Sequence, residues 1–381
     1  MNYIELTLHK MELKAVTLKK KNIKKSAKRV SRNNEIAEFY FLMGAEQCDV
    51  DGEFETTFAN KAENVKQCYR FWNLDYYRLQ SVKDIKHINL CKDKFCLNCQ
   101  HIIAQRRELK YMIPLDELRK NYDIYHVVIT VPNCKQSELR ATLDRMYAKF
   151  PYVIQYMQGK RKSNNLNFVK FGFYGAIRAL EVTHKLTENG FEFHPHFHCL
   201  FVLRQGLDKK KKHTNEFSFS KGKKVREFSD DEIFLQKVWH LLYNGERLTA
   251  ENYNNLKQGY SVTMDDCKGH YHQVFKYVLG GNFKKGMPLF DYEEFKTLYN
   301  ALFRRKLIQG YGALNKFTFD EDIEQEDIDE IYNGIIAKLQ EVEQAEPQNQ
   351  SLDEVLNDIE NKPNITYISR SNIRSYVKGQ K

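Results

Sequence analysis

Three histidines stand close together between His194 and His198, directly before the apolar run of residues 199–203. Side chains alternate between the two faces of a β-strand, so a strand here places His196 and His198 on the same face, about 7 Å apart along the chain. Two imidazoles at this spacing can share one divalent ion. Pro195 lacks an N–H group, so it must lie at an edge, at a bulge or at the beginning of the strand.

Glu181 is the candidate third ligand, because residues 174–203 have the pattern of a β-hairpin around Asn189-Gly190. A two-residue loop at these positions sets Glu181 opposite His198, whereas a three-residue loop would move Glu181 to the other face. Two imidazoles and one carboxylate leave coordination positions open, which is typical of a catalytic ion acting as a Lewis acid on a phosphate oxygen. The alternative is that the histidines are ordinary packed or surface residues.

A second group of reactive side chains lies in HYHQVFKYVLG, residues 270–280. Gln273, Lys276, Tyr277 and Gly280 follow the spacing i, i+3, i+4 and i+7, which predicts one face of a helix. A tyrosine that attacks phosphorus forms a covalent ester and so conserves the energy of the broken bond, while Lys276 could hold the phosphate. The pattern is weak alone, because the chain has 23 tyrosines and most tyrosines serve packing.

Four of the 8 cysteines form a cluster that precedes these motifs. Their close spacing and soft donors favour a structural zinc site in a reducing compartment, where disulfides are rare. The alternative is that some are free buried thiols. The expected zinc ligands are Cys68, Cys91, Cys96 and Cys99, whereas Cys48, Cys134, Cys199 and Cys267 are expected to be packed thiols.

The composition favours a polyanionic partner. Lys and Arg number 60 against 50 for Asp and Glu, a net charge of +10, and 13% of the 381 residues are aromatic and could stack on unpaired bases. The beginning of the chain does not resemble a signal peptide, and no run of about 18 apolar residues occurs, so we expect a soluble, cytoplasmic protein without a membrane partner. The residues expected to contact DNA phosphates are Arg106, Arg107, Lys209, Lys210, Lys211 and Lys212.

The sequence patterns around these residues suggest that the chain has four segments. Residues 125–133 predict a buried strand. The basic run between Lys14 and Arg32 predicts a mobile arm, which either touches phosphates or is a solvated tail. The expected segments are a basic N-terminal arm (1–60), a Cys-rich zinc and DNA-binding module (61–112), a catalytic domain (113–300) and a helical, partly acidic C-terminal extension (301–381).

Three signatures occur in order: VVITVPN at 127–133, HPHFHCLFVL at 194–203 and HQVFKYVLG at 272–280. Together they resemble the replication initiator (Rep) proteins of rolling-circle plasmids, members of the HUH endonuclease superfamily, over roughly residues 65–285. The resemblance implies an α+β fold with a central antiparallel sheet of about five strands flanked by helices. It also implies Mg²⁺ or Mn²⁺ on His196, His198 and Glu181. Cysteines similar to those of the cluster precede the first signature in the family.

The resemblance further implies that Tyr277 nicks one strand of the origin, keeps the 5′ phosphate and frees a 3′ hydroxyl, and then rejoins the strand. Expected partners are origin DNA, a host helicase, a host DNA polymerase and, as one option, a second copy of the chain. Gln273 departs from relatives that carry a glutamate there, and it cannot act as a base. Another carboxylate, or a second tyrosine such as Tyr271, would then serve termination.

Three other functions remain open from the sequence. One is a relaxase or transposase-like single-strand nuclease, which uses the same chemistry. Another is a non-enzymatic DNA-binding regulator, which would tolerate loss of Tyr277. The last is a simple metal-dependent hydrolase, which would leave no covalent adduct.

Overall fold

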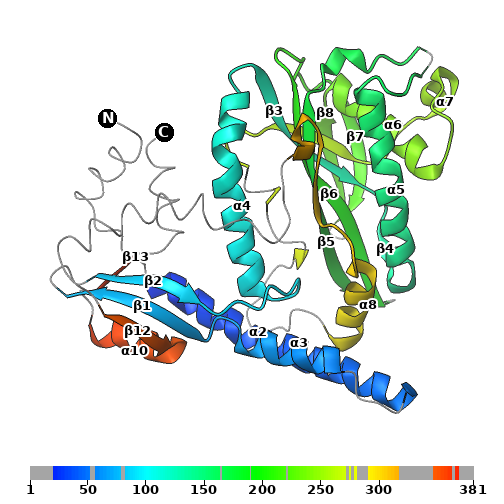
Figure 1. The fold of residues 1–381 in the computed structure, drawn as a ribbon. Helices are drawn as coiled ribbons and strands as arrows, with labels where there is room; N and C mark the ends of the chain where they lie inside the picture. Colours follow the sequence, from blue (N-terminus) through cyan, green and yellow to red (C-terminus); the bar gives the residue numbers. More distant parts are fainter. Residues whose placement is uncertain are drawn as a thin grey trace. The chain divides into compact units, whose positions relative to one another are not determined.

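The computed structural model describes residues 20–51, 56–78, 82–163, 165–188, 190–219, 222–271, 274–275, 279–280, 291–316, 346–362 and 365–368. The chain divides into two compact units (Figure 1). The first comprises residues 1–110, 286–289 and 321–381, and the second comprises residues 111–285 and 290–320. Across the described ranges, no helix combines the length and apolar character needed to cross a membrane.

The second unit is built on a sheet whose main path joins five strands. Their order is β10 (Leu279–Gly280), β5 (Gly175–Thr187), β6 (Gly190–Arg204), β3 (Tyr122–Thr130) and β9 (Val262–Asp266). Two further strands extend it, since β11 (Ile308–Gly312) pairs with β5 and β4 (Cys134–Lys135) pairs with β6. Every pairing is antiparallel except β10 with β5. The predicted α+β class with a central antiparallel sheet of about five strands is confirmed.

Helices cover one face of this sheet (Figure 1). The aromatic ring of Phe197 on β6 packs against Tyr147 and Phe150 of α5 (Leu139–Met157), with ring centroids 5.6 and 5.3 Å apart. Because side chains alternate along β6, His196 and His198 must lie on the opposite face. The other helices of this unit are the end of α4 (Leu97–Leu118), α6 (Asp230–Asn244), α7 (Ala250–Asn255) and α8 (Tyr292–Leu302). The short 3₁₀ turns are η1 (Gln136–Glu138), η2 (Val169–Phe171) and η3 (Ala313–Lys316).

The β5–β6 hairpin turns one residue earlier than the sequence suggested. Thr187 pairs with Gly190, so Glu181 lies opposite His196, and the predicted pairing with His198 is wrong. Gly190 is the first residue of β6 and has a φ of +97°, a conformation that glycine adopts without strain. Both sides of the turn shift by one residue, so the register changes by two positions and Glu181 stays on the histidine face.

The helix predicted over residues 270–280 does not occur at the residues that the structure describes there. Val274 and Phe275 lie in a turn and a bend and are buried, and Leu279–Gly280 forms β10 against Val182 and Thr183 of β5. Backbone pairing with the exposed edge of β5 overrides the helical side-chain spacing. Tyr277, Lys276 and Gln273 lie outside the described residues.

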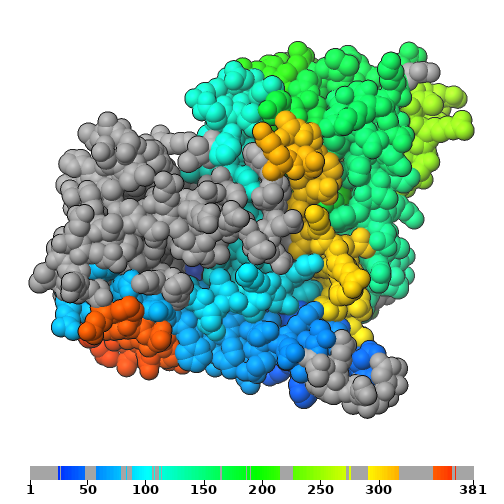
Figure 2. Space-filling view, in the orientation of Figure 1, coloured from blue at the N-terminus to red at the C-terminus, as the bar shows by residue number. Residues whose placement is uncertain are grey.

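The first unit contains a four-stranded sheet that joins distant parts of the chain. Its order is β12 (Pro347–Ser351), β1 (Phe71–Tyr77), β2 (Val82–Ile88) and β13 (Thr366–Ile368). Trp72 and Leu74 of β1 form a core cluster with Val30 and with Leu352 and Val355. The helices are α2 (Lys20–Asp51), α3 (Thr56–Gln67), α10 (Leu352–Asn361) and the beginning of α4 (Leu97–Leu118). Figure 2 shows α10, in orange to red, at the surface beside blue residues from the N-terminal part of the chain.

Two expectations for the chain ends are corrected here. Residues 20–51 of the expected arm form a continuous helix, because Val30 and its neighbour Ala27 find apolar partners around Trp72. Residues 1–19 of that arm lie outside the described residues. The C-terminal extension, expected to be helical, also contributes β11, β12 and β13. These strands pair with segments far away in sequence, and local patterns do not reveal such partners.

Candidate metal centres

Glu181, His196 and His198 bring three ligand atoms together on the sheet face opposite α5. Glu181 Oε2 lies 2.9 Å from His196 Nε2 and 2.6 Å from His198 Nε2, and the two Nε2 atoms are 3.1 Å apart. Burial opposes the charged form of Glu181, yet its hydrogen bonds with both histidines hold the pKa of this carboxyl well below its ordinary value. The three predicted ligands therefore meet at one point, with the carboxylate in its charged form.

These distances fit an octahedral ion. Mg²⁺ binds ligands at about 2.0–2.1 Å in octahedral geometry, so adjacent ligand atoms lie about 3.0 Å apart. The observed separations of 2.6 to 3.1 Å match such a triangle. One carboxylate and two imidazoles would occupy three of six positions, which leaves room for water and a phosphate oxygen. The donor set also suits Mn²⁺.

Backbone and side-chain contacts orient both imidazoles. His196 Nδ1–H donates to the carbonyl oxygen of His194 at 3.0 Å, which directs Nε2 at the ligand cluster. His198 Nδ1 lies 2.8 Å from His126 Nε2, and the two rings are parallel within 4°. Sequence analysis missed His126, although the alternation of the strand at 125–133 places it on the same face as Val128, which pairs with His198.

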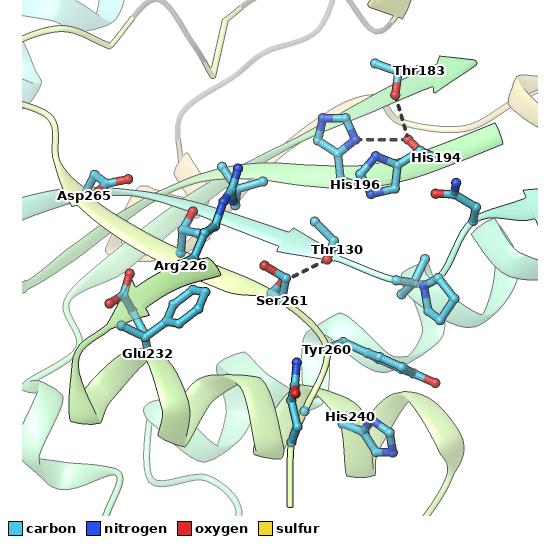
Figure 3. Close-up of a pocket in the computed structure, with 18 of the residues that line it drawn as sticks. Thr130, Thr183, His194, His196, Arg226, Glu232, His240, Tyr260, Ser261 and Asp265 are labelled. Atoms are coloured by element: carbon cyan, nitrogen blue, oxygen red, sulfur yellow. Dashed lines mark hydrogen bonds between the residues drawn. The ribbon is translucent and has the colours of Figure 1, made fainter. Parts of the chain in front are cut away.

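The candidate site opens onto a pocket of about 1360 Å³ through His196. Figure 3 shows His194 and His196 at the top of this pocket and Tyr260 with His240 at the bottom. Thr130 lies between them and donates its hydroxyl to the carbonyl of Ser261 at 2.9 Å. Ligand pockets for drug-sized molecules measure about 300–1,000 Å³, so this pocket has space for a larger ligand.

The lysine run between β6 and β7 (His213–Phe219) is held by carboxylates. Lys211 lines the pocket and lies 2.6 Å from the buried Glu232 of α6. Lys209 pairs with Asp123 and Asp266, and Lys212 pairs with Asp208 and Asp230. Lys210 is exposed, and its side chain forms no ion pair with any residue that the structure describes. The lysines at 209, 211 and 212 would thus have to exchange partners to contact DNA, which makes Lys210 the most accessible of the four.

The remaining predicted DNA contacts and the alternative tyrosine are placed differently. Arg107 is half-buried on α4, and the side chain of Arg106 is outside the described set. Tyr271 is buried, and its hydroxyl donates to Asp116 Oδ1 at 2.8 Å. Burial, together with this hydrogen bond, raises the pKa of Tyr271 far above its usual range. Tyr271 is therefore held as a neutral phenol and is poorly suited to act as a nucleophile.

The cysteine cluster of the first unit brings four sulfur atoms together. Cys68 Sγ lies 3.4 Å from Cys96 Sγ and 3.5 Å from Cys99 Sγ, and Cys91 Sγ lies 3.7 Å from Cys99 Sγ. These distances are far longer than a disulfide bond of about 2.05 Å. A tetrahedral zinc ion with Zn–S bonds of about 2.3 Å separates its sulfur ligands by about 3.8 Å. The cluster therefore fits a zinc site, as expected from the sequence.

Three N–H groups point at the sulfur atoms of this cluster. The backbone N–H of Cys91 donates to Cys68 Sγ at 3.4 Å, and that of Lys92 donates to Cys99 Sγ at 3.2 Å. The side-chain amide of Asn33 donates to Cys96 Sγ at 3.1 Å. Hydrogen bonds among the thiols, with Cys68 the largest contributor, lower the pKa of Cys96 and raise the pKa of Cys91 and of Cys99. Such donors stabilise thiolates, the form that binds metal.

Fold and site together define an α+β protein that carries an open two-histidine, one-carboxylate site on a central antiparallel sheet. Residues 82–216 match the model of a family described as replication protein. The matched segment contains Glu181, His196 and His198 and ends before Tyr277. No solved structure matches the chain at a significant level.

Three curated proteins, each named Protein rep, are similar to this chain. The protein from Bacillus sp. is 29% identical over 156 residues, and the protein from Bacillus amyloliquefaciens is 28% identical over 156 residues. Each alignment covers 39% of this chain, and 45% and 41% of the respective relatives. The protein from Streptococcus pneumoniae is 29% identical over 245 residues, which cover 59% of this chain and 61% of that protein. The chain thus spans about half the length of these relatives, and the predicted resemblance to Rep proteins is confirmed.

Proposed function

We propose that this protein initiates plasmid replication by nicking one strand of the origin with a tyrosine nucleophile. The observation that carries the proposal is the convergence of Glu181, His196 and His198 within 3.1 Å, with His196 lining a pocket of about 1360 Å³. Their geometry suits an ion that contacts phosphate, and the resemblance to Rep proteins supplies the substrate class. A divalent ion held there would withdraw electron density from a phosphate oxygen.

Tyr277 is the proposed nucleophile. It lies outside the described residues, but Leu279, two residues later, pairs with Val182, and Val182 directly follows Glu181. This pairing supports a nucleophile that approaches the ligand cluster from the β5 edge. Lys276 would contact the scissile phosphate, and Gln273 could orient a water molecule but cannot remove its proton.

The proposed reaction is a transesterification that conserves the phosphodiester bond energy. The phenol oxygen of Tyr277 forms a bond to phosphorus, the P–O3′ bond breaks, and the proton lost by the phenol is balanced by the one gained by the 3′ oxygen. The product is a 5′-phosphotyrosine link and a free 3′ hydroxyl. Attack of a 3′ hydroxyl on the phosphotyrosine reverses the step and rejoins the strand. A host polymerase would extend the freed 3′ end, and a host helicase would unwind the duplex. A second copy of the chain is a further candidate partner. We expect the reaction to take place in the cytoplasm.

The test uses the full chain with 3′-labelled single-stranded fragments of its plasmid and Mg²⁺ or Mn²⁺. We expect a labelled fragment that migrates with the protein on a denaturing gel. The link disappears with Tyr277→Phe, which removes only the hydroxyl, and persists with Tyr253→Phe, a matched control on α7.

The same gel separates the alternatives. Cleavage without a covalent link would indicate a simple metal-dependent hydrolase and would overturn the proposal. Binding without cleavage, unaffected by Tyr277→Phe, would indicate a regulator. Covalent cleavage of single strands combined with failure to nick a supercoiled origin would favour a relaxase or transposase-like nuclease.

A further inference from the structure

The basic N-terminal run lies on a helix, α2, and its charges share one face. Lys25, Lys28, Arg29 and Arg32 follow the spacing i, i+3, i+4 and i+7. Lys25 and Lys28 are exposed, and Arg29 is partly exposed. Arg32 is also partly exposed, but its Nη1 atom is buried. The apolar residues of α2, such as Val30, Ile36 and Tyr40, are buried inside the first unit. Asn33 and Ile36, one and two turns after Arg29 on the same side of the helix, are buried, so the basic face is exposed only in the N-terminal turns of α2.

The buried side of α2 forms part of the cysteine cluster. Asn33 is fully buried, and its side chain is used at both ends, because Nδ2 donates to Cys96 Sγ at 3.1 Å and Oδ1 accepts from the Leu97 N–H at 3.2 Å. Tyr40, two turns later, donates its hydroxyl to both carboxylate oxygens of Asp93, at 3.0 and 2.9 Å. Asp93 also accepts the backbone N–H of Phe95. Two anchors thus tie α2 to the loop that carries Cys91 and Cys96.

We propose that α2 is a duplex DNA-docking helix and that zinc at the cysteine cluster fixes its position through Asn33. This proposal rests on the proposed function only in taking DNA as the partner. Asn33 acts as a positioning residue, since it touches a zinc ligand and not the metal or the DNA. The docking face consists of Lys25, Lys28, Arg29 and Arg32.

Duplex DNA fits this face better than a lipid surface does. An α-helix enters the major groove, which is about 12 Å wide, and a row of basic side chains on one face can reach the phosphates beside it. A helix that binds a membrane needs exposed apolar residues beside its charges. Here Val30, the apolar residue between the basic positions, is buried in the first unit. The exposed apolar residues of α2, Phe41 and Leu42, lie more than two turns beyond Arg32 and so are not beside the charges.

Zinc binding and DNA binding are coupled through the loop that carries Cys91 and Cys96. Zinc holds Cys96 and Cys99 at the beginning of α4 and Cys91 on the preceding loop, so the acceptors for Asn33 and Tyr40 keep fixed positions. Without metal, the four sulfur atoms have no common partner, and the two anchors of α2 are no longer held in place. The docking face then samples several orientations and binds DNA more weakly.

The first experiment measures zinc and duplex DNA binding in the full chain. Zinc is removed from the wild-type protein with a chelator and then added back, while binding of a fluorescent origin duplex is followed by anisotropy. We expect affinity to fall at least about 10-fold on removal and to return with Zn²⁺ but not with Mg²⁺. Unchanged duplex affinity in the zinc-free protein would overturn the coupling.

The second experiment tests Asn33. Asn33→Ala should weaken zinc binding by about 10- to 100-fold, as loss of a hydrogen bond to a metal ligand does elsewhere. Duplex affinity should fall at limiting zinc and recover at saturating zinc, whereas Ser31→Ala, an exposed neighbour on α2, should change neither. Recovery at high zinc separates a positioning role from misfolding. Zinc affinity within twofold of wild type would refute the role of Asn33.

The third experiment tests the docking face by salt dependence. The slope of log K against log salt falls by about 0.9 for each phosphate that the protein no longer neutralises, so Lys25/Lys28/Arg29→Ala should reduce it by roughly 2–3. Lys160/Arg161/Lys162→Ala removes the same charges from an exposed turn of the second unit and should change the slope by less than about 0.5. Equal slopes for both triple variants would refute the docking face. The nicking assay uses only Tyr277, Tyr253 and wild-type protein, so either proposal can fail without the other.

Discussion

The two candidate metal centres differ in how much of the ion their ligands would enclose. The cysteine cluster supplies four sulfur atoms, a complete tetrahedral set, and three N–H groups point at them. The histidine site supplies three atoms on one side of the ion and faces a pocket. Ligands that fill every coordination position of a metal ion stabilise the fold, whereas ligands that leave positions open allow the ion to bind a substrate. The cysteine cluster is therefore suited to stabilise the first unit, and the histidine site is suited to act on a substrate.

Removal of one thiol should have the largest effect. Cys96→Ser takes one of four ligands from a zinc site, whose binding free energy is typically about 10–16 kcal/mol at neutral pH. We expect loss of bound zinc, measured by atomic emission, and a lower unfolding temperature of the first unit. Cys134→Ser, a buried thiol of the second unit, is the control. Full zinc content in the Cys96→Ser variant would contradict the claim that all four cysteines are needed to bind zinc.

Loss of one imidazole should abolish chemistry without unfolding the chain. His196→Ala and His198→Ala should each slow nicking of single-stranded DNA at least about 10³-fold, or about 4 kcal/mol in activation free energy. His213→Ala removes an exposed histidine that pairs with Asp230, and it should leave the rate within twofold. Single-turnover kinetics provide the measurement. A large loss of zinc in the His196 variant would contradict the separation of the two centres.

His126 should have an intermediate effect, because it acts through His198. His126→Ala removes the partner of His198 Nδ1 and should weaken Mn²⁺ binding about 10- to 100-fold. His126→Gln retains an acceptor for the His198 N–H and should recover most of the affinity. The dependence of the nicking rate on Mn²⁺ concentration reports both values. A reduced rate at saturating Mn²⁺ with unchanged affinity would instead point to direct contact with DNA.

Tyr271→Phe should have the smallest effect. It deletes the hydrogen bond to Asp116 and should lower the free energy of unfolding by about 1 kcal/mol. Nicking and rejoining should stay within twofold of wild type, because a buried phenol with a raised pKa is a poor nucleophile. Thermal unfolding and a rejoining assay are the measurements. Selective loss of rejoining would instead make Tyr271 the second nucleophile.

The sequence correctly predicted the features that depend on side-chain alternation in strands and on short residue spacings. The strand at 125–133, the hairpin, the ligand face of Glu181 and the four-cysteine cluster all follow from periods of two residues or from short spacings. The register of Glu181 was missed by two positions, because the choice between neighbouring two-residue turns depends on one backbone conformation at Gly190. His126 was missed because its role depends on which strand lies beside β6. No local pattern encodes that neighbour.

The pairing of β1 with β12 sets an order for synthesis. Phe71–Tyr77 leaves the ribosome long before Pro347–Ser351, the segment that completes one edge of its sheet. At translation rates of about 5–20 residues per second, that delay is roughly 15–55 seconds. During this interval β1 has an unpaired edge and Trp72 lacks the apolar cover of Leu352 and Val355. A nascent chain or one truncated before β12 therefore lacks a finished N-terminal sheet, and only a chain that extends through Ile368 of β13 can assemble it.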